Sequence, residues 1–316
     1  MRILEELNHD ESLKYYFETE YENERSTQIV EKIKYYINLD NKLEAANIYS
    51  SFCNAICVLT RKNARNIIRN PGALRLQFGQ IFFFSFLAGS IFWKLPNTSE
   101  GNRGRLGFAI FFTINNFMMH VMRMVVNFPL ERLLLKDDYN SNLYGIGSFT
   151  FAKQIVETPI ALLLSTIFVC VVYFMVGYQE TAVNFFTFLG IYVTLAFYTQ
   201  SFGYAFTSLF SSMDQAFRTI NISVVVFIIF SGVIINHANM PVWLGWIRFI
   251  DPIFYGFQCA IVNEFTEYKI NEGFDFFALL NKNIPIWKYM VILIGISFFL
   301  RILQMIELQM VVNRKL

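Results

Sequence analysis

Residues 128–144 are the stretch of this sequence whose side chains are best suited to specific polar chemistry. They read Phe-Pro-Leu-Glu-Arg-Leu-Leu-Leu-Lys-Asp-Asp-Tyr-Asn-Ser-Asn-Leu-Tyr, the only strongly charged island between two long apolar blocks. Carboxylate and cationic groups at this density suit ion pairing with a partner, and the interleaved leucines suit a helix that lies at a membrane interface or docks on a protein. We expect a short loop at one membrane face, to which a cytoplasmic partner binds. The alternative is a solvated turn that only connects its neighbours.

Several polar side chains lie inside the apolar block that precedes this island, namely Asn115, Asn116, His120 and Arg123. His120 and Arg123 are three residues apart, and Asn116 lies one helical turn before His120, so these residues share a helix face. Polar groups in hydrocarbon avoid lipid and point at partner helices or a cavity. A transport pathway and plain hydrogen bonding between helices both account for them.

The residue sets of the common catalytic sites are missing from this sequence. It contains no Gly-x-x-x-x-Gly-Lys-Ser/Thr phosphate-binding loop, no Ser/His/Asp set, no paired-carboxylate site and no His-Glu-x-x-His helix. We therefore expect no catalytic site, metal site or cofactor within this chain. No basic patch with interleaved aromatic residues occurs, so we expect no nucleic-acid partner.

The composition predicts that a membrane positions these residues. Of the 316 residues, 55% are hydrophobic and only 16% are charged, whereas soluble domains are about 45–50% apolar and about 25% charged. A hydrocarbon core of about 30 Å requires about 20 helical residues to cross it, and its lack of water forces each crossing segment to be helical. We predict an all-α polytopic membrane protein with six transmembrane helices, at residues 74–92, 106–126, 149–176, 183–209, 219–235 and 286–312.

Further segments flank or interrupt these spans. Residues 1–47 are polar and too short to bury a core, which predicts a cytoplasmic linker remnant. Residues 48–72 carry apolar residues at helical spacing and then several bases, which predicts an amphipathic connecting helix on the lipid surface or on another protein domain. Residues 73–316 form the six-helix domain. The tryptophans and phenylalanines after residue 242 predict a re-entrant or outer helix between the fifth and sixth spans.

The distribution of basic residues favours cytoplasmic amino and carboxyl termini. On this topology the inner flanks carry more Lys and Arg than the outer loops do. Lys94, Arg103 and Arg105, placed in the first outer loop, oppose the trend, and the basic helix before the first span decides the choice. We predict an integral, multi-pass protein of the plasma membrane or an internal membrane.

A series of short motifs resembles one known family. The series comprises Arg61-x-x-x-Arg65-Asn66-x-x-Arg69-Asn70-Pro71, Phe128-Pro129-x-Glu131-Arg132 with Tyr144 and Lys153 beyond, Glu157-x-Pro159, Phe230-Ser231-Gly232-Val233-Ile234-Ile235-Asn236, Pro241-x-Trp243-x-x-Trp246, Tyr255-Gly256 and Asn263-Glu264-Phe265. Their order and spacing, over about residues 51–312, resemble the ABC-2 type membrane domain of G-subfamily ABC transporters, the white/multidrug-resistance half-transporters.

The resemblance implies the substrate-translocating domain of an ATP-driven exporter of lipids, sterols or amphipathic small molecules. It implies a second half-transporter as partner, in a homo- or heterodimer surrounded by membrane lipids. It also implies an ATP-binding cassette domain that binds ATP and Mg²⁺ and that is missing from this chain. The alternative is an ATP-independent membrane bundle, either scramblase-like or a scaffold remnant of a transporter.

The resemblance also implies roles for individual residues. The residues implied to couple the domain to the ATPase are Glu131, Arg132, Lys136 and Tyr144, together with Arg61 and Arg65 of the connecting helix. A substrate cavity between the second and fifth spans of two protomers falls on Asn116, Met119, Asn221, Val224, Val225 and Ile228, with a hydrophobic gate at Val233 and Ile234. Met119 stands at the position of the family's aromatic clamp, so a preference for flat aromatic substrates is not implied.

Overall fold

The computed structural model describes residues 52–313, except residues 70, 97, 141–142, 180, 211, 233, 235–239, 242 and 266–284. Over these residues the chain forms helices joined by turns and no strand, which confirms the predicted all-α fold. The helices are α3 (Phe52–Arg69), α4 (Pro71–Ile91), α5 (Ser99–Asn140), α6 (Ile146–Val176), α7 (Ala182–Ser208), α8 (Met213–Phe230), η2 (Ile247–Phe249), α9 (Pro252–Phe265) and α10 (Ile286–Asn313). The predicted linker at residues 1–47 lies outside the described residues.

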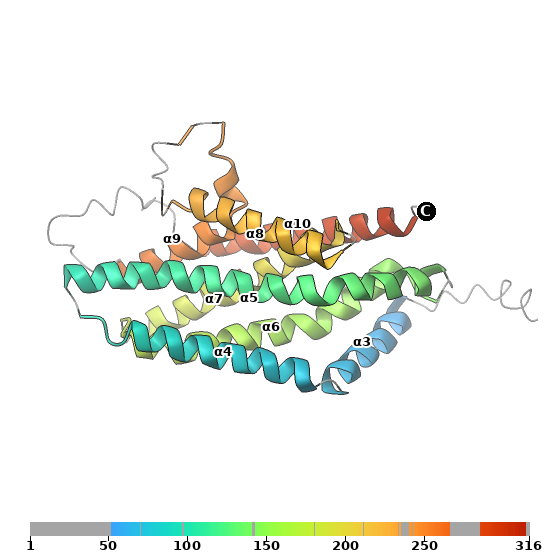
Figure 1. The fold of residues 1–316 in the computed structure, drawn as a ribbon, viewed down its shortest axis with the longest axis horizontal. Helices are drawn as coiled ribbons and strands as arrows, with labels where there is room; N and C mark the ends of the chain where they lie inside the picture. The colour runs from blue at the N-terminus through green and yellow to red at the C-terminus, as the bar shows by residue number, and fades with distance from the viewer. Residues whose placement is uncertain are drawn as a thin grey trace, which may run out of the picture. The chain divides into compact units, whose positions relative to one another are not determined.

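The predicted set of membrane-spanning helices is confirmed. Helices α4, α5, α6, α7, α8 and α10 are each long and apolar enough to cross a membrane. Figure 1 shows α4, α5 and α6 running side by side, and α7 packs against α5, α6, α9 and α10. Helix α7 thus contacts four other helices, whereas α3 and α4 pack against α6.

The core between these helices is rich in aromatic side chains. Phe112 of α5 stacks on Phe168 of α6, with ring centroids 4.5 Å apart, and meets Tyr192 of α7 edge-on at 4.3 Å. Each such pair adds about 0.5–1.5 kcal/mol beyond the burial of its area. Because lipid is as apolar as the core, helices in a membrane associate through close contacts of this kind rather than through the hydrophobic effect.

Two glycines allow backbone placements that larger residues would prevent. Gly177 ends α6 with a φ of 75°, a left-handed conformation that glycine adopts without steric cost. A Cβ atom on Gly256 would lie 2.7 Å from Thr113 Cγ2 and 2.9 Å from Leu195 Cδ2. The absence of that atom lets α9 approach α5 and α7 closely.

The charged stretch at residues 128–144 is not the loop that the sequence predicts. Helix α5 continues through it to Asn140, so the turn between the second and third spans begins only after this residue. Phe128 and Leu135 are seven positions apart, share one helix face, and are both fully buried in a cluster with Ile146, Phe149 and Tyr204. Burial of this face explains why the helix does not end where the apolar span ends.

Several predicted boundaries also shift. Helix α5 begins at Ser99 rather than at residue 106, so Arg103 and Arg105 are helical and do not lie in a loop. Helix α8 begins at Met213, where the Ser212 hydroxyl accepts a hydrogen bond from Gln215 N at 3.3 Å, and it ends at Phe230 rather than at residue 235. Side-chain capping by Ser212 supplies a helix start that hydropathy alone does not show.

Short helices occur at the two additional positions that the sequence predicts. Helix α3 occupies most of residues 48–72, and α9 lies between α8 and α10 in the chain. Helix α9 is almost entirely buried and packs against α5, α7, α8 and α10. The amphipathic placement of α3 on lipid and the re-entrant course of α9 stay predictions.

Candidate functional site

The extension of α5 past its membrane span packs on a buried lysine of α6. We call the surrounding residues the junction cluster and define it as Phe128, Glu131, Lys153, Glu157 and Tyr204; the Glu131 side chain is 36% exposed and the others are buried. The Lys153 side chain is only 3% exposed and forms ion pairs with Glu131 and, at 3.6 Å, with Glu157. Its Nζ atom also lies 5.1 Å from the centroid of the Phe128 ring and 5.6 Å from that of Tyr204. The Tyr204 hydroxyl donates a hydrogen bond to Glu157. One lysine thus joins α5, α6 and α7.

Arg132 fixes the same part of α5 to the end of α7. Its Nη1 atom donates to the backbone oxygens of Ser208, at 3.2 Å, and Phe210, at 2.5 Å. These oxygens belong to the end of a helix, where backbone carbonyl groups lack intrahelical partners and attract positive charge. Partial burial lowers the pKa of the Arg132 guanidinium below its usual value. Arg132 therefore attaches α5 to the end of α7 and to the residue that follows it.

Asp138 joins the far end of α5 to two other elements. The Tyr144 hydroxyl donates to Asp138 Oδ2 at 2.5 Å, and Lys62 Nζ of α3 lies 3.8 Å from the same oxygen. Burial, followed by the neighbouring Asp138 carboxylate, raises the pKa of the Tyr144 hydroxyl. Arg61 and Arg65 are exposed on α3, and the side chain of Lys136 lies outside those that the structure describes. The structure thus brings Glu131, Arg132 and Tyr144 to one end of the bundle.

The residues predicted to line a cavity lie on helices that contact each other, α5 and α8. They are not equally exposed within this single chain: Asn116 and Val224 are buried, Met119, Asn221 and Ile228 are partly buried, and Val225 is 57% exposed. Of the predicted gate, Ile234 is exposed and Val233 lies outside the described residues. Their shared role stays a prediction.

Asn116 takes part in a buried polar contact between helices. Its Nδ2 atom donates to Ser165 Oγ of α6 at 3.2 Å, and the same hydroxyl lies 2.7 Å from His120 Nε2. The three side chains are at most 2% exposed. This arrangement corresponds to the hydrogen-bonding alternative that the sequence left open for His120 and Asn116.

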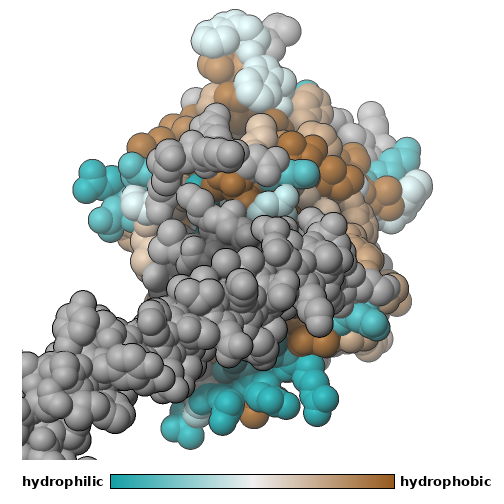
Figure 2. Space-filling model, turned by 90° about the vertical axis from the view of Figure 1, so that its right-hand side faces the viewer, coloured by the Kyte–Doolittle hydropathy of each residue, from teal (hydrophilic) through white to brown (hydrophobic). Residues whose placement is uncertain are grey.

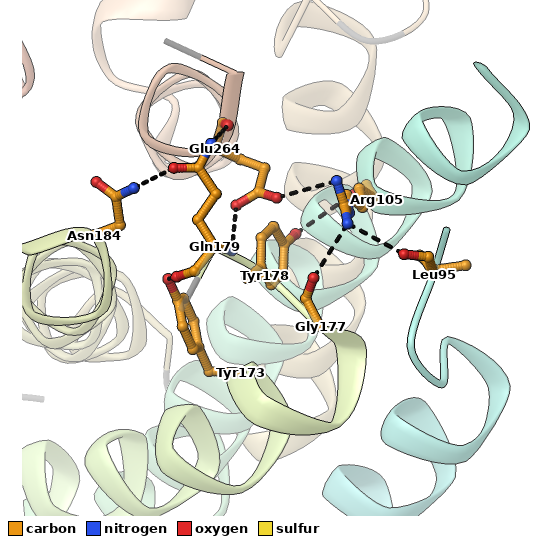
Figure 3. A network of polar contacts seen from close by, with 8 residues as sticks. All are labelled: Leu95, Arg105, Tyr173, Gly177, Tyr178, Gln179, Asn184 and Glu264. Carbon is orange, nitrogen blue, oxygen red and sulfur yellow. Dashed lines mark hydrogen bonds and ion pairs between the residues drawn. The ribbon is translucent and has the colours of Figure 1, made fainter. Parts of the chain in front are cut away.

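A second polar network lies at the opposite end of the bundle (Figure 3), and it is not among the features predicted from the sequence. Arg105 Nη1 lies 3.4 Å from Glu264 Oε1, and Arg105 Nη2 donates to the oxygens of Leu95 and Gly177 at 3.1 and 3.2 Å. Gln179 donates to Glu264 through its backbone N at 3.3 Å, and its Nε2 donates to the Glu264 backbone O at 2.8 Å. Two features of the sequence could have pointed to this network: a charged residue at the start of a span, and an acid inside Asn263-Glu264-Phe265.

The comparison with known proteins gives the family. Residues 54–265, more than half of the chain, match the family described as ABC-2 type transporter.

The chain belongs to the ABC-2 type transporter family.

Several similar proteins are named as ABC transporters of the G family. The mouse protein named "Broad substrate specificity ATP-binding cassette transporter ABCG2" is 28% identical over 227 residues, which cover 72% of this chain and 34% of the relative. The bovine protein of the same name is 27% identical over 281 residues, 82% of this chain and 43% of the relative. The Arabidopsis thaliana "ABC transporter G family member 7" is 28% identical over 183 residues, which cover 58% of this chain and 25% of the relative. The chain spans less than half the length of these relatives.

The buried contact at Ser165 of this ABC-2 domain should contribute to its stability. Ser165→Ala removes the hydroxyl that pairs with both Asn116 and His120, and an unpaired buried polar group costs about 1–3 kcal/mol. We expect a lower thermal unfolding temperature in detergent. The neighbouring substitution Thr166→Val is the control, because that hydroxyl bonds the Leu162 oxygen of its own helix. Equal melting temperatures for both variants would contradict the expectation.

Glu264 should make stability depend on pH. Burial raises the pKa of this carboxyl from 4.5 to about 7, against the opposing effects of the Gln179 N–H and Arg105. The folded protein then binds a proton more readily than the unfolded chain, so this carboxyl contributes less stability as pH rises from 4.5 to about 7. Thermal unfolding between pH 5 and pH 8, compared with Glu264→Gln, should show a pH-dependent difference. If the unfolding temperatures of the two proteins changed with pH in parallel, the predicted contribution of Glu264 would be refuted.

Proposed function

We propose that this chain is the substrate-translocating domain of an ATP-driven exporter of lipids, sterols or amphipathic small molecules. Membership of the ABC-2 family supports the transport role, and the names of the mouse and bovine relatives describe ATP-binding cassette transporters of broad substrate specificity. Export and its dependence on ATP are inferences for this chain.

The observation that carries the proposal is the rigid course of α5. This single helix runs from Ser99, beside the Arg105–Glu264 network, through a membrane span to the junction cluster and Asn140. A continuous helix that forms an ion pair with a buried residue near each end transmits a displacement from one end to the other better than two segments joined by a loop. We assign the junction cluster, Arg132 and Tyr144 to the surface that contacts an ATP-binding cassette domain.

In this proposal the junction cluster and both termini are cytoplasmic. Helix α3 connects the amino-terminal residues to the first span along the lipid surface, and α9 is the re-entrant helix at the outer face. ATP and Mg²⁺ are bound by a nucleotide-binding domain, since these residues contain no phosphate-binding loop. That domain is supplied by a partner or by further polypeptide.

The cavity of the proposed transporter requires a second half-transporter. Val225 is 57% exposed and Ile222 is 65% exposed on α8, so this helix presents an apolar face outside the single chain. A facing copy of α8 would cover it, and Asn221 and Met119 would lie at the edge of the enclosed space. The lining is apolar with a few amide groups, which suits amphipathic substrates.

The test is transport in native membranes. Inside-out vesicles would be prepared from cells that naturally contain the protein and from cells in which its gene is disrupted. A fluorescent amphipathic lipid should accumulate only with ATP, only in the first preparation, and not with a non-hydrolysable ATP analogue. Accumulation that is lost on gene disruption but proceeds without ATP would instead identify the ATP-independent bundle.

A further inference from the structure

Helix α3 carries two free thiols on one face. Cys53 and Cys57 are separated by four residues, about one helical turn, and both are exposed. The described cysteine that is buried, Cys259, lies in α9, and the exposed Cys170 lies near the other end of α6. Among the described residues, two exposed cysteines therefore lie within one helical turn only in the first half of α3.

The surroundings of these thiols differ around the helix. Ala55 and Leu59 are buried and pack one face of α3 onto the beginning of α6 and its neighbours. At 100° per residue, the thiols lie on the opposite side of α3 from this packed face, together with Ala64 and Ile68. The exposed bases Arg61, Lys62, Arg65 and Arg69 lie along one flank, between the thiols and the packed face. Figure 2 shows hydrophilic residues gathered along the lower edge, where Figure 1 places the end of α3 and the beginning of α4.

The contacts of α3 place the thiols at the boundary of the membrane span. The ring of Phe52, the residue before Cys53, meets the ring of Phe151 edge-on at 6.1 Å. Phe151 belongs to the apolar span of α6, five residues after its first residue, and is 45% exposed. Cys53 therefore directly follows the residue that contacts the beginning of the apolar span, and the bases on the adjacent flank suit anionic headgroups.

We propose that Cys53 and Cys57 form an S-acylation site that accepts long-chain acyl groups from acyl-coenzyme A. A cysteine sulfur attacks the acyl carbonyl, a new thioester S–C bond forms, and the bond to coenzyme A breaks. Coenzyme A leaves as a thiol with the proton that the cysteine loses, so no oxidant or reductant is needed. A cysteine on a basic helix beside a membrane is the setting in which reversible acylation occurs.

Acylation would fix α3 against the lipid surface. Each chain would insert into lipid from the side of α3 that faces away from α6 and would hold that side on the membrane surface. Because Lys62 of α3 lies 3.8 Å from Asp138 of α5, the modification would also restrain the α5 end that we assign to ATPase coupling. The inference rests on the cytoplasmic placement of α3 proposed above, and it adds a covalent regulation to that surface.

The test is chemical capture of thioesters on the full chain in eukaryotic cell membranes. After free thiols are blocked, hydroxylamine cleaves thioesters and each released thiol is labelled with a polyethylene glycol maleimide. We expect up to two mass shifts for the wild type, at most one for Cys53→Ser or Cys57→Ser, and none for the double variant. Cys170→Ser, which changes an exposed cysteine at the other end of α6, should leave the pattern unchanged. Serine at these exposed positions leaves the packed face of α3 intact.

Two results would overturn the site. The first is the lack of any hydroxylamine-dependent mass shift, while a known acylated protein is captured from the same membranes. The second is a mass shift that persists in the double variant. A membrane-impermeant maleimide, applied to intact and permeabilised cells after hydroxylamine, reports separately on which side α3 lies. If the thiols reacted only after permeabilisation but showed no hydroxylamine-dependent shift, the acylation site would be refuted, whereas the proposed orientation and function would remain.

Discussion

Glu264→Ala should destabilise this domain severely, far more than the loss of an exposed carboxylate would. Glu264 is 1% exposed and pairs with Arg105, which is 4% exposed. Removing one partner of a buried ion pair leaves the other charge uncompensated and costs about 3–5 kcal/mol. We expect the melting temperature in detergent to fall by on the order of 10 °C. The loss should also loosen α9, because Gln179 would lose the carboxylate that its backbone N–H contacts.

Two control variants separate the ion pair from general damage. Glu100→Ala removes an exposed carboxylate near the same end of α5, and a surface substitution of this kind changes stability by about 0.5 kcal/mol or less. The double variant Arg105→Met/Glu264→Met replaces both charges by apolar groups and should recover much of the loss. If the double variant were as unstable as Glu264→Ala, the uncompensated charge would not be the cause.

The number of membrane helices could be predicted from the sequence because each span is limited by hydrocarbon thickness. Leu164, Phe168 and Val172 lie in a run with few polar residues, and such a run is recognisable without any knowledge of its neighbours. The turn after α6 was also recognisable, since Gly177 supplies a left-handed residue. These features depend on local composition alone.

The extent of α5 could not be predicted in this way. Hydropathy falls after residue 126, but the helix continues because Phe128 and Leu135 bury themselves against residues of α6 and α7. That surface is formed by chain segments that follow later, so no local pattern reports it. A helix that leaves the membrane and stays packed on protein looks, in sequence, like a charged loop.

The two polar ends of the bundle illustrate the same limit. Glu131 and Arg132 stand out in the sequence as charged residues beside an apolar span, but their partners, Lys153 and the carbonyls of Ser208 and Phe210, depend on helix packing. Arg105 and Glu264 lie far apart in the sequence, which placed Arg105 in an outer loop and Glu264 in the motif Asn263-Glu264-Phe265 with no sign that they pair. Pairing between distant residues requires the fold.

Substitution of Glu131 should uncouple transport from ATP hydrolysis in the proposed transporter. Glu131→Ala removes the carboxylate of α5 that pairs with buried Lys153, while Glu157 still compensates the lysine at 3.6 Å. The domain should therefore fold, but the α5 extension would lose its ion pair to α6. Coupling free energies between distant sites are about 1–3 kcal/mol, so ATP-dependent accumulation of the lipid probe should fall by about 5–150-fold.

The measurement combines transport, ATP hydrolysis and thermal unfolding on the same vesicle preparation. Arg132→Ala should behave like Glu131→Ala, because it removes the bonds from α5 to the Ser208 and Phe210 oxygens. Lys288→Ala is the control: this exposed lysine lies in the first turn of α10, at the opposite end of the bundle, and should leave transport unchanged. Unimpaired ATP-dependent transport in both α5 variants would exclude the junction cluster as the coupling surface. Lost transport with an unchanged melting temperature would show that these contacts transmit the ATPase cycle rather than hold the fold together.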